Sequence, residues 1–112
     1  RKITKVLIIG VAYKKDLDDT RESPSIDFIK ILKNKKIKVD IHDPNIKLLK
    51  SRKLNNVYVS KKLNQKMIKN YDCVIITTDH TNIDYKLIKK NAKFIVDTKN
   101  VFKQKLNKVL KL

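Results

Sequence analysis

The chain runs ITKVLIIGVAYKKDLDDTRESPS over residues 3–25, an apolar segment followed by a long polar one. The apolar residues predict a buried strand over 3–9 that ends at Gly10, because short runs rich in β-branched residues favour strands. Ser23 and Pro24 predict a helix start, with serine as N-cap and proline at the first helical position. The connection between strand and helix is roughly twice as long as an ordinary joint of about 2–6 residues. The surplus length indicates a binding loop, since open α/β sheets bind ligands beyond the carboxyl ends of their strands.

Apolar runs and helical segments alternate along the rest of the chain. Further strands are expected over residues 37–42, 57–59, 72–78 and 93–97, and further helices over 45–52, 60–70, 84–91 and 101–112. This alternation is typical of βαβ units, in which the strands are parallel and the crossovers right-handed. Residues 1–112 are therefore predicted to form a single α/β domain. Its expected architecture is a Rossmann-like three-layer α/β/α sandwich with a mainly parallel sheet of about five strands.

The strand order predicts where a ligand would bind. In a doubly wound sheet the first and fourth strands are neighbours at the point where the order reverses, so the loops after the first, fourth and fifth strands line one crevice. These loops carry cations, hydroxyls and an imidazole: Tyr13, Lys14 and Arg21, then Thr78, Asp79 and His80, then Lys99 and Asn100. Lys14 and Lys99 can act as point charges for a diphosphate, and Tyr13 can stack on a base or sugar. The crevice therefore suits a phosphate-bearing ligand.

The formal charge of +17 is also typical of nucleic-acid-binding proteins. However, 25 of the 28 basic residues are lysine, whereas bidentate recognition of bases and phosphates favours arginine. Lysine, isoleucine and asparagine, which all have AT-rich codons, make up 50 of the 112 residues. Drift in composition therefore explains most of the charge, and no specific nucleic acid is expected as a partner.

Familiar catalytic and cofactor motifs are missing from the sequence. Gly10 is the only glycine, so the dinucleotide fingerprint lacks its second and third glycines and the domain is predicted to be a poor primary site for NAD. Asp43 lies too far from Gly10 to be the ribose-binding acid and is expected to cap its strand. His42 and His80 show no metal-ligand spacing, and His80 is expected to stabilise its loop. Cys73 lies in an apolar run and is expected to pack as a small hydrophobe.

A single cysteine cannot form an internal disulfide, which fits a reducing, cytoplasmic setting. No apolar stretch approaches the ~20 residues that span a bilayer, so no membrane is expected as a partner. A chain that begins at Arg1 and enters a strand at once is expected to be part of a longer protein.

Several motifs together carry a resemblance to a known family. They are VLIIGVAYKKD and DTRESPS within residues 6–25, Asp43-Pro44, Thr78-Asp79-His80, and IVDTKNV over residues 95–101. In this order they resemble the C-terminal domain of the UDP-glucose/GDP-mannose dehydrogenase family, and the resemblance covers nearly the whole chain. The tyrosine, the DTRESP stretch and the Thr-Asp-His sequence look closest to the UDP-N-acetylhexosamine 6-dehydrogenases.

The resemblance implies that this domain binds the UDP part of a UDP-sugar substrate. In the family a preceding Rossmann domain binds NAD, and a central helical segment holds the catalytic cysteine and lysine. The parent enzyme is expected to be a homo-oligomer that oxidises the sugar C6 alcohol to a carboxylate with two NAD. Tyr13 and Lys14 match substrate contacts, and Arg21 matches a residue that reaches the NAD. Lys99 stands where many members have a substrate-binding arginine, which keeps the charge but loses the bidentate fork.

No catalytic residue is expected within this chain, because Cys73 does not match the catalytic cysteine of the family. The chain alone is therefore expected to be inactive. Two alternatives stay open beside the UDP-binding interpretation: a basic nucleic-acid-binding α/β module and a structural oligomerisation domain.

Overall fold

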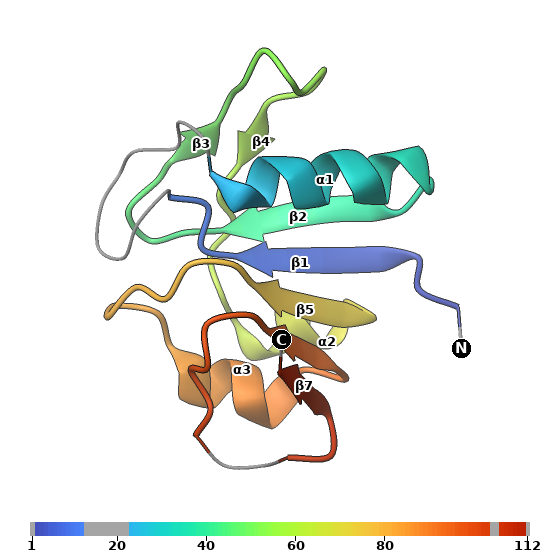
Figure 1. Ribbon diagram of the computed structural model, residues 1–112. Helices are drawn as coiled ribbons and strands as arrows, with labels where there is room; N and C mark the ends of the chain where they lie inside the picture. Colours follow the sequence, from blue (N-terminus) through green and yellow to red (C-terminus); the bar gives the residue numbers. More distant parts are fainter. Residues whose placement is uncertain (1, 13–22, 104–105, 112) are drawn as a thin grey trace.

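A five-stranded parallel sheet forms the centre of the computed structural model, which describes residues 2–12, 23–103 and 106–111 (Figure 1). Its strands, in spatial order, are β2 (Lys38–His42), β1 (Lys5–Ile9), β5 (Cys73–Ile76), β6 (Ile95–Asp97) and β7 (Val109–Lys111). Every neighbouring pair is parallel. The predicted α/β class and parallel sheet are therefore confirmed, including the neighbouring positions of the first strand and the strand after residue 72.

Helices cover both faces of this sheet. They are α1 (Pro24–Asn34), α2 (Gln65–Lys69) and α3 (Tyr85–Asn91). Successive side chains of β1 point to opposite faces. Ile8 accordingly packs with Ile29 of α1, whereas Leu7 packs with Ile68 of α2 and Ile88 of α3. Each of these side chains is fully buried and stabilises the fold by about 1.5–3 kcal/mol. The result is the expected three-layer α/β/α sandwich, with α1 beside β2 and α3 toward the β7 end of the sheet (Figure 1).

Helix α1 begins where its capping residues predict. The Ser23 side chain accepts a hydrogen bond from the backbone N–H of Ser25 at 3.2 Å, and Pro24 is the first helical residue. Asp27 lies in the first turn, where its charge interacts favourably with the helix dipole. The chain leaves the helix through Lys36, whose φ of 61° lies in the left-handed region.

The segment after β2 differs from its prediction. Instead of a helix over 45–52, it contains β3 (Leu48–Leu49), which pairs antiparallel with β4 (Tyr58–Val59) in a separate two-stranded sheet. The strand expected over 57–59 therefore exists, but outside the main sheet. Strand pairing explains the difference: Leu48 lies opposite Val59 and Leu49 opposite Tyr58, and Leu49 is fully buried.

The helix expected over 60–70 is shorter than predicted. It begins at Gln65, because Asn64 rather than Ser60 acts as the N-cap and accepts from the Met67 N–H at 2.8 Å. The Ser60 hydroxyl instead accepts from the Asp43 N–H at 2.8 Å and donates to the Asp43 carbonyl at 3.0 Å. Ser60 therefore joins the β4 segment to the end of β2.

The helix predicted over 101–112 is also wrong. Its last part forms β7, which pairs with β6 and brings Ile95 opposite Val109. The Ile95 N–H donates to the Lys108 carbonyl at 2.8 Å, so pairing satisfies backbone groups that would otherwise stand open at the edge of β6. Within residues 2–12, 23–103 and 106–111, no helix is long and apolar enough to cross a membrane.

Candidate functional site

The loops that the sequence singled out meet at one edge of the sheet, where β1, β2, β5 and β6 end. We call this the carboxyl edge. Ile9 at the end of β1 lies opposite both His42 of β2 and Ile76 of β5, and Ile76 lies opposite Asp97 of β6. The loops after β1, β5 and β6 therefore begin side by side at this edge, as the strand order predicted, and the loop after β2 joins them.

Gly10 allows the chain to turn sharply against the β5 loop. Its φ is 80°, and a Cβ added there would lie 2.2 Å from the Thr78 carbonyl oxygen. The Thr78 hydroxyl donates to the Ala12 carbonyl at 2.6 Å, and the Thr77 hydroxyl donates to the Gly10 carbonyl. The first three residues after β1 are thus fixed to the first two after β5. Because this close packing covers the glycine, the described backbone leaves no open face for a dinucleotide pyrophosphate, and these residues do not fit a primary NAD site.

A buried carboxylate joins three of the loops. Asp43 is 2% exposed, and its Oδ2 accepts from the N–H groups of Val11 at 2.7 Å and Ala12 at 3.1 Å. The same oxygen lies 2.9 Å from Nε2 of His80, while Oδ1 accepts from the Asn45 N–H. Asp43 thus caps the turn after β2 as expected, and it also holds the β1 loop, which the sequence did not reveal.

His80 lies inside this cluster and is completely buried. Its Nδ1 lies 3.2 Å from the side-chain nitrogen of Asn45, whose side-chain oxygen accepts from the Asn82 amide at 3.1 Å. With Asn45 donating to Nδ1, the imidazole proton is on Nε2 and points at Asp43. The loop-stabilising role expected for His80 is consistent with this geometry.

A second buried carboxylate organises the loop after β6. Asp97 is completely buried and accepts from the N–H groups of Lys99 and Val101 at 3.1 Å and Phe102 at 3.0 Å. The loop turns through Asn100, whose φ is 54°. Lys99 is exposed on this loop. The side chain predicted to meet a diphosphate therefore stands at the carboxyl edge on a fixed backbone.

Three predicted site residues, Tyr13, Lys14 and Arg21, lie outside the described residues. The described chain reaches Ala12 on one side of them and resumes at Ser23 on the other. Ala12 is held by Asp43 and Thr78, and Ser23 is the N-cap of α1.

The sequence did not single out Asp97 as the residue that holds the loop after β6, although its position after an apolar run resembles that of Asp43. An acid that ends a strand and precedes a turn residue is the signal that would have found it. The contact between Asp43 and His80 has no such signal, because the two residues are 37 positions apart.

The titratable groups near the core are unsuited to nucleophilic chemistry. Burial raises the pKa of Cys73 to about 11, and the charge of Asp72 acts in the same direction. The cysteine is 3% exposed and packs in the core as expected. Burial also lowers the pKa of His42, against the effect of the hydrogen bond with the Lys61 carbonyl. Among the described residues no three metal-ligating side chains lie together.

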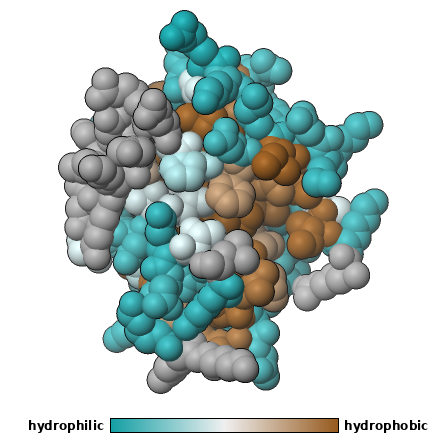
Figure 2. Space-filling view, viewed as in Figure 1, coloured by the Kyte–Doolittle hydropathy of each residue, from teal (hydrophilic) through white to brown (hydrophobic). Residues whose placement is uncertain are grey.

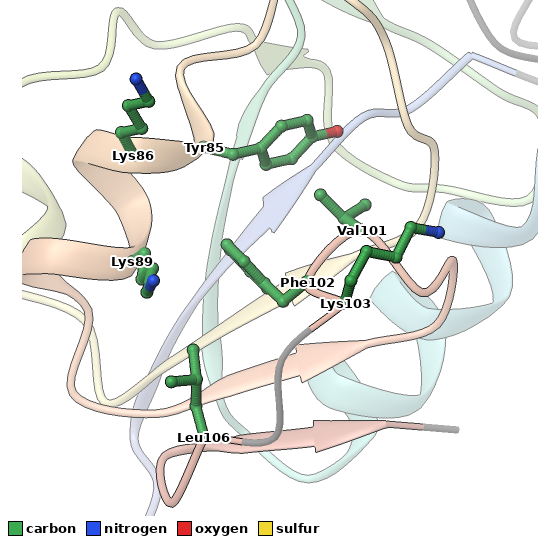
Figure 3. A pocket seen from close by; sticks show the side chains of 7 residues that line it. All are labelled: Tyr85, Lys86, Lys89, Val101, Phe102, Lys103 and Leu106. Atoms are coloured by element: carbon green, nitrogen blue, oxygen red, sulfur yellow. The ribbon is translucent and has the colours of Figure 1, made fainter.

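A pocket of about 350 Å³ lies between α3 and the chain that follows β6 (Figure 3). The Tyr85 and Phe102 rings meet edge-on within its wall, 6.1 Å apart. Burial and the nearby Asp79 carboxylate raise the pKa of Tyr85, although its hydroxyl has no partner of ordinary hydrogen-bond geometry among the described residues. Lysines form the rim: Lys86, Lys89 and Lys103. Val101 and Phe102 of the loop after β6 line this pocket, but Lys99 does not.

Hydrophilic residues surround a more hydrophobic area on one face of the molecule. In Figure 2 they lie at the top, right and bottom of the visible face.

Comparison with known proteins identifies the family and the fold. Residues 7–104 match the UDP binding domain of the UDP-glucose/GDP-mannose dehydrogenase family. A UDP-N-acetyl-D-mannosamine dehydrogenase of Methanococcus vannielii is 33% identical over 112 residues, which cover 91% of this chain and 24% of that protein.

Two solved structures have similar folds. The UDP-D-ManNAc dehydrogenase from Pyrococcus horikoshii superposes with a TM-score of 0.71 at 25% identity, covering 97% of this chain and 25% of that one. The UDP-N-acetyl-mannosamine dehydrogenase from S. aureus has a TM-score of 0.67 at 32% identity, covering 96% and 25%. The chain thus spans about a quarter of the length of these relatives. Because the sequence match extends over most of the chain and the folds agree, the chain belongs to the UDP-glucose/GDP-mannose dehydrogenase family, as its UDP binding domain.

Proposed function

We propose that this chain binds the UDP part of a nucleotide sugar at the carboxyl edge of its sheet. The observation that carries the proposal is the convergence of the β1, β2, β5 and β6 loops around two buried carboxylates, Asp43 and Asp97. In this proposal Tyr13 stacks on the nucleoside, and Lys14 and Lys99 neutralise the diphosphate. Buried networks of this kind hold the backbone around them rigid. A rigid backbone loses less conformational entropy on binding, which favours affinity for the ligand.

The proposal extends to the parent enzyme, an NAD-dependent UDP-sugar 6-dehydrogenase. It would convert the C6 alcohol, with water and two NAD⁺, into a carboxylate, two NADH and three protons. NAD would be bound by another domain, with Arg21 reaching it across the cleft, and the catalytic groups would also lie outside this chain. Relatives named UDP-N-acetyl-D-mannosamine dehydrogenase favour a UDP-N-acetylhexosamine as substrate. A cytoplasmic location is also part of the proposal, and the free, buried thiol of Cys73 is consistent with it. A homo-oligomeric parent is also part of the proposal.

Titration of the chain with UDP, followed by NMR, tests the binding proposal. We expect the backbone signals of Tyr13, Lys14 and Thr98–Asn100 to move with millimolar or better affinity. Lys14→Met and Lys99→Met should each weaken binding by about fivefold or more, because each removes a charge-assisted contact to phosphate.

Lys93→Met is the matched control for Lys99→Met. Lys93 is exposed and lies just before the amino end of β6. The variant therefore loses the same charge at the edge of the sheet opposite to the carboxyl edge. It should bind UDP as the original chain does. Equal weakening by both variants would show that only bulk charge attracts UDP. A steep salt dependence of oligonucleotide binding would then favour the nucleic-acid-binding alternative.

A further inference from the structure

The carboxylate of Asp43 stands out because it is charged and fully enclosed. Its side chain, like that of His80, has no exposed area. Removing a carboxylate from water is costly unless hydrogen bonds replace its hydration. Here four donors do so, and they come from three different loops: Val11 and Ala12 after β1, Asn45 after β2, and His80 after β5.

The hydrogen bonds to Asp43 Oδ2 fix both the position and the orientation of the Val11 and Ala12 peptides. Two successive N–H groups, those of Val11 and Ala12, point at this one oxygen from 2.7 and 3.1 Å. Both peptide planes are therefore oriented by Asp43, while the Ala12 carbonyl is held from the other side by the Thr78 hydroxyl. The Val11 and Ala12 peptides are therefore fixed, and Tyr13 and Lys14 follow them directly in the sequence.

His80 is the group that keeps Asp43 in place. Its Nε2 lies 2.9 Å from the same Oδ2 that accepts the two backbone N–H groups. On the other side of the ring, Nδ1 accepts from Asn45, which is itself held by Asn82. Without the imidazole, Oδ2 would lose one of its three donors, and only backbone N–H groups would hold the carboxylate.

We propose that Asp43 and His80 act as a positioning pair that sets the affinity for the nucleoside diphosphate, by fixing the backbone from which the Tyr13–Lys14 segment starts. The inference rests on the proposed function. Neither residue touches the ligand in this account, since both are enclosed by the loops that they join. Their effect passes through the Val11 and Ala12 peptides.

The test compares three histidine variants of the full chain. His80→Leu removes both ring nitrogens and should weaken UDP binding at least tenfold. His80→Gln keeps a donor near the Nε2 position and should bind within about threefold of the original chain. His42→Gln is the matched control: His42 ends β2 directly before Asp43, and its Nδ1 donates to the Lys61 carbonyl at 2.6 Å rather than to the Asp43 carboxylate. Its affinity should be unchanged.

Two further measurements separate positioning from stability. Thermal unfolding identifies a temperature at which every variant is folded, and affinities are compared there. Hydrogen exchange of the Val11 and Ala12 amides should be faster in His80→Leu and restored in His80→Gln. If His80→Leu does not fold, Asn45→Ala replaces it. This variant removes the partner of Nδ1 and the acceptor of the Asn82 amide, but it keeps the backbone N–H that donates to Asp43. It should weaken UDP binding by about threefold.

The outcomes distinguish this inference from the proposed function. If Lys14→Met abolishes UDP binding but His80→Leu changes only the melting temperature, UDP binding stands and the positioning pair is wrong. If the original chain does not bind UDP at all, the proposed function is wrong. The hydrogen exchange of the Val11 and Ala12 amides then tests by itself whether Asp43 and His80 fix this backbone. Unchanged exchange of Val11 and Ala12 in His80→Leu would overturn the inference.

Discussion

Gly10 is the residue at which the smallest change should have the largest structural effect. An added methyl group would lie 2.2 Å from the Thr78 carbonyl oxygen, which belongs to the backbone and cannot rotate away. We predict that Gly10→Ala lowers the free energy of unfolding by about 3–5 kcal/mol, since clash and left-handed strain act together. Urea denaturation followed by circular dichroism measures this change.

Asn100→Ala is the control for Gly10→Ala. Asn100 also has a positive φ, 54°, but is exposed, so its variant reports left-handed strain without a clash. It should cost about 1 kcal/mol. If Gly10→Ala costs no more than this, the close packing of the β1 and β5 loops is not what makes glycine necessary.

Lys99 offers a gain of function at a single residue. Lysine approaches phosphate as a point charge, whereas the arginine fork can donate two parallel hydrogen bonds. We predict that Lys99→Arg strengthens UDP binding by about three- to tenfold, a typical range for one added hydrogen bond. Calorimetric titration with UDP measures it, with Lys93→Arg as the control that should change nothing. Weaker binding by Lys99→Arg would mean that the loop fixed by Asp97 does not face the diphosphate.

The buried thiol of Cys73 should make the free energy of unfolding fall at alkaline pH. Burial raises its pKa to about 11, whereas a cysteine in the unfolded chain titrates near ~8.5. The native state therefore keeps this proton in a range where the unfolded state has lost it, and the free energy of unfolding falls as pH rises from about 9 to about 11. Cys73→Ala should show a flatter decline over this range. Urea denaturation at pH 7, 9, 10 and 11 compares the two chains, and parallel declines would contradict the prediction.

At the scale of elements, the turn that ends α1 places a lysine, Lys36, in a left-handed conformation that lysine disfavours. The Lys36 N–H donates to the Lys33 carbonyl at 2.9 Å and the Ile37 N–H to the Leu32 carbonyl at 3.0 Å. This is the Schellman pattern, which favours glycine at the left-handed position that Lys36 occupies. We predict that Lys36→Gly raises the free energy of unfolding by about 0.5–1 kcal/mol.

Lys35→Gly tests whether the gain at position 36 is specific. Lys35, with a φ of −88°, needs no left-handed freedom, so its variant should lose stability through chain entropy alone. Thermal melts of both variants decide the matter. A loss of stability in Lys36→Gly would show that the lysine side chain contributes more than the strain costs.

The elements also show what the sequence could predict. Ser23-Pro24 located the start of α1 because capping is decided by neighbouring residues. The end of the chain could not be predicted in this way: residues 101–112 favour a helix locally, but the open edge of β6 draws Val109–Lys111 into a strand. The adjacent positions of the loops after β1, β5 and β6 followed from strand order alone. The link between Asp43 and His80 did not, because it depends on the packing of two loops that are distant in sequence.

At the scale of the whole molecule, the excess of lysine should make stability depend on salt. The described residues extend 37 × 31 × 26 Å. The screening length is about 30 Å at 0.01 M salt and about 10 Å at 0.1 M, so in dilute buffer each lysine interacts with charges across the molecule. A net charge of +17 then opposes the compact state. We predict that the free energy of unfolding rises by about 1 kcal/mol or more between 0.01 and 0.5 M NaCl.

A variant with six exposed lysines changed to glutamine isolates this charge effect. Suitable positions lie away from the carboxyl edge: Lys38, Lys50, Lys66, Lys69, Lys89 and Lys90. Repulsion within one molecule scales with the square of its net charge, so the loss of six charges should reduce the salt response by more than half. The affinity for UDP should change far less than in Lys99→Met, because the cations proposed to meet the diphosphate are kept. An equal salt response in both chains would show that salt acts through something other than the repulsion between lysines.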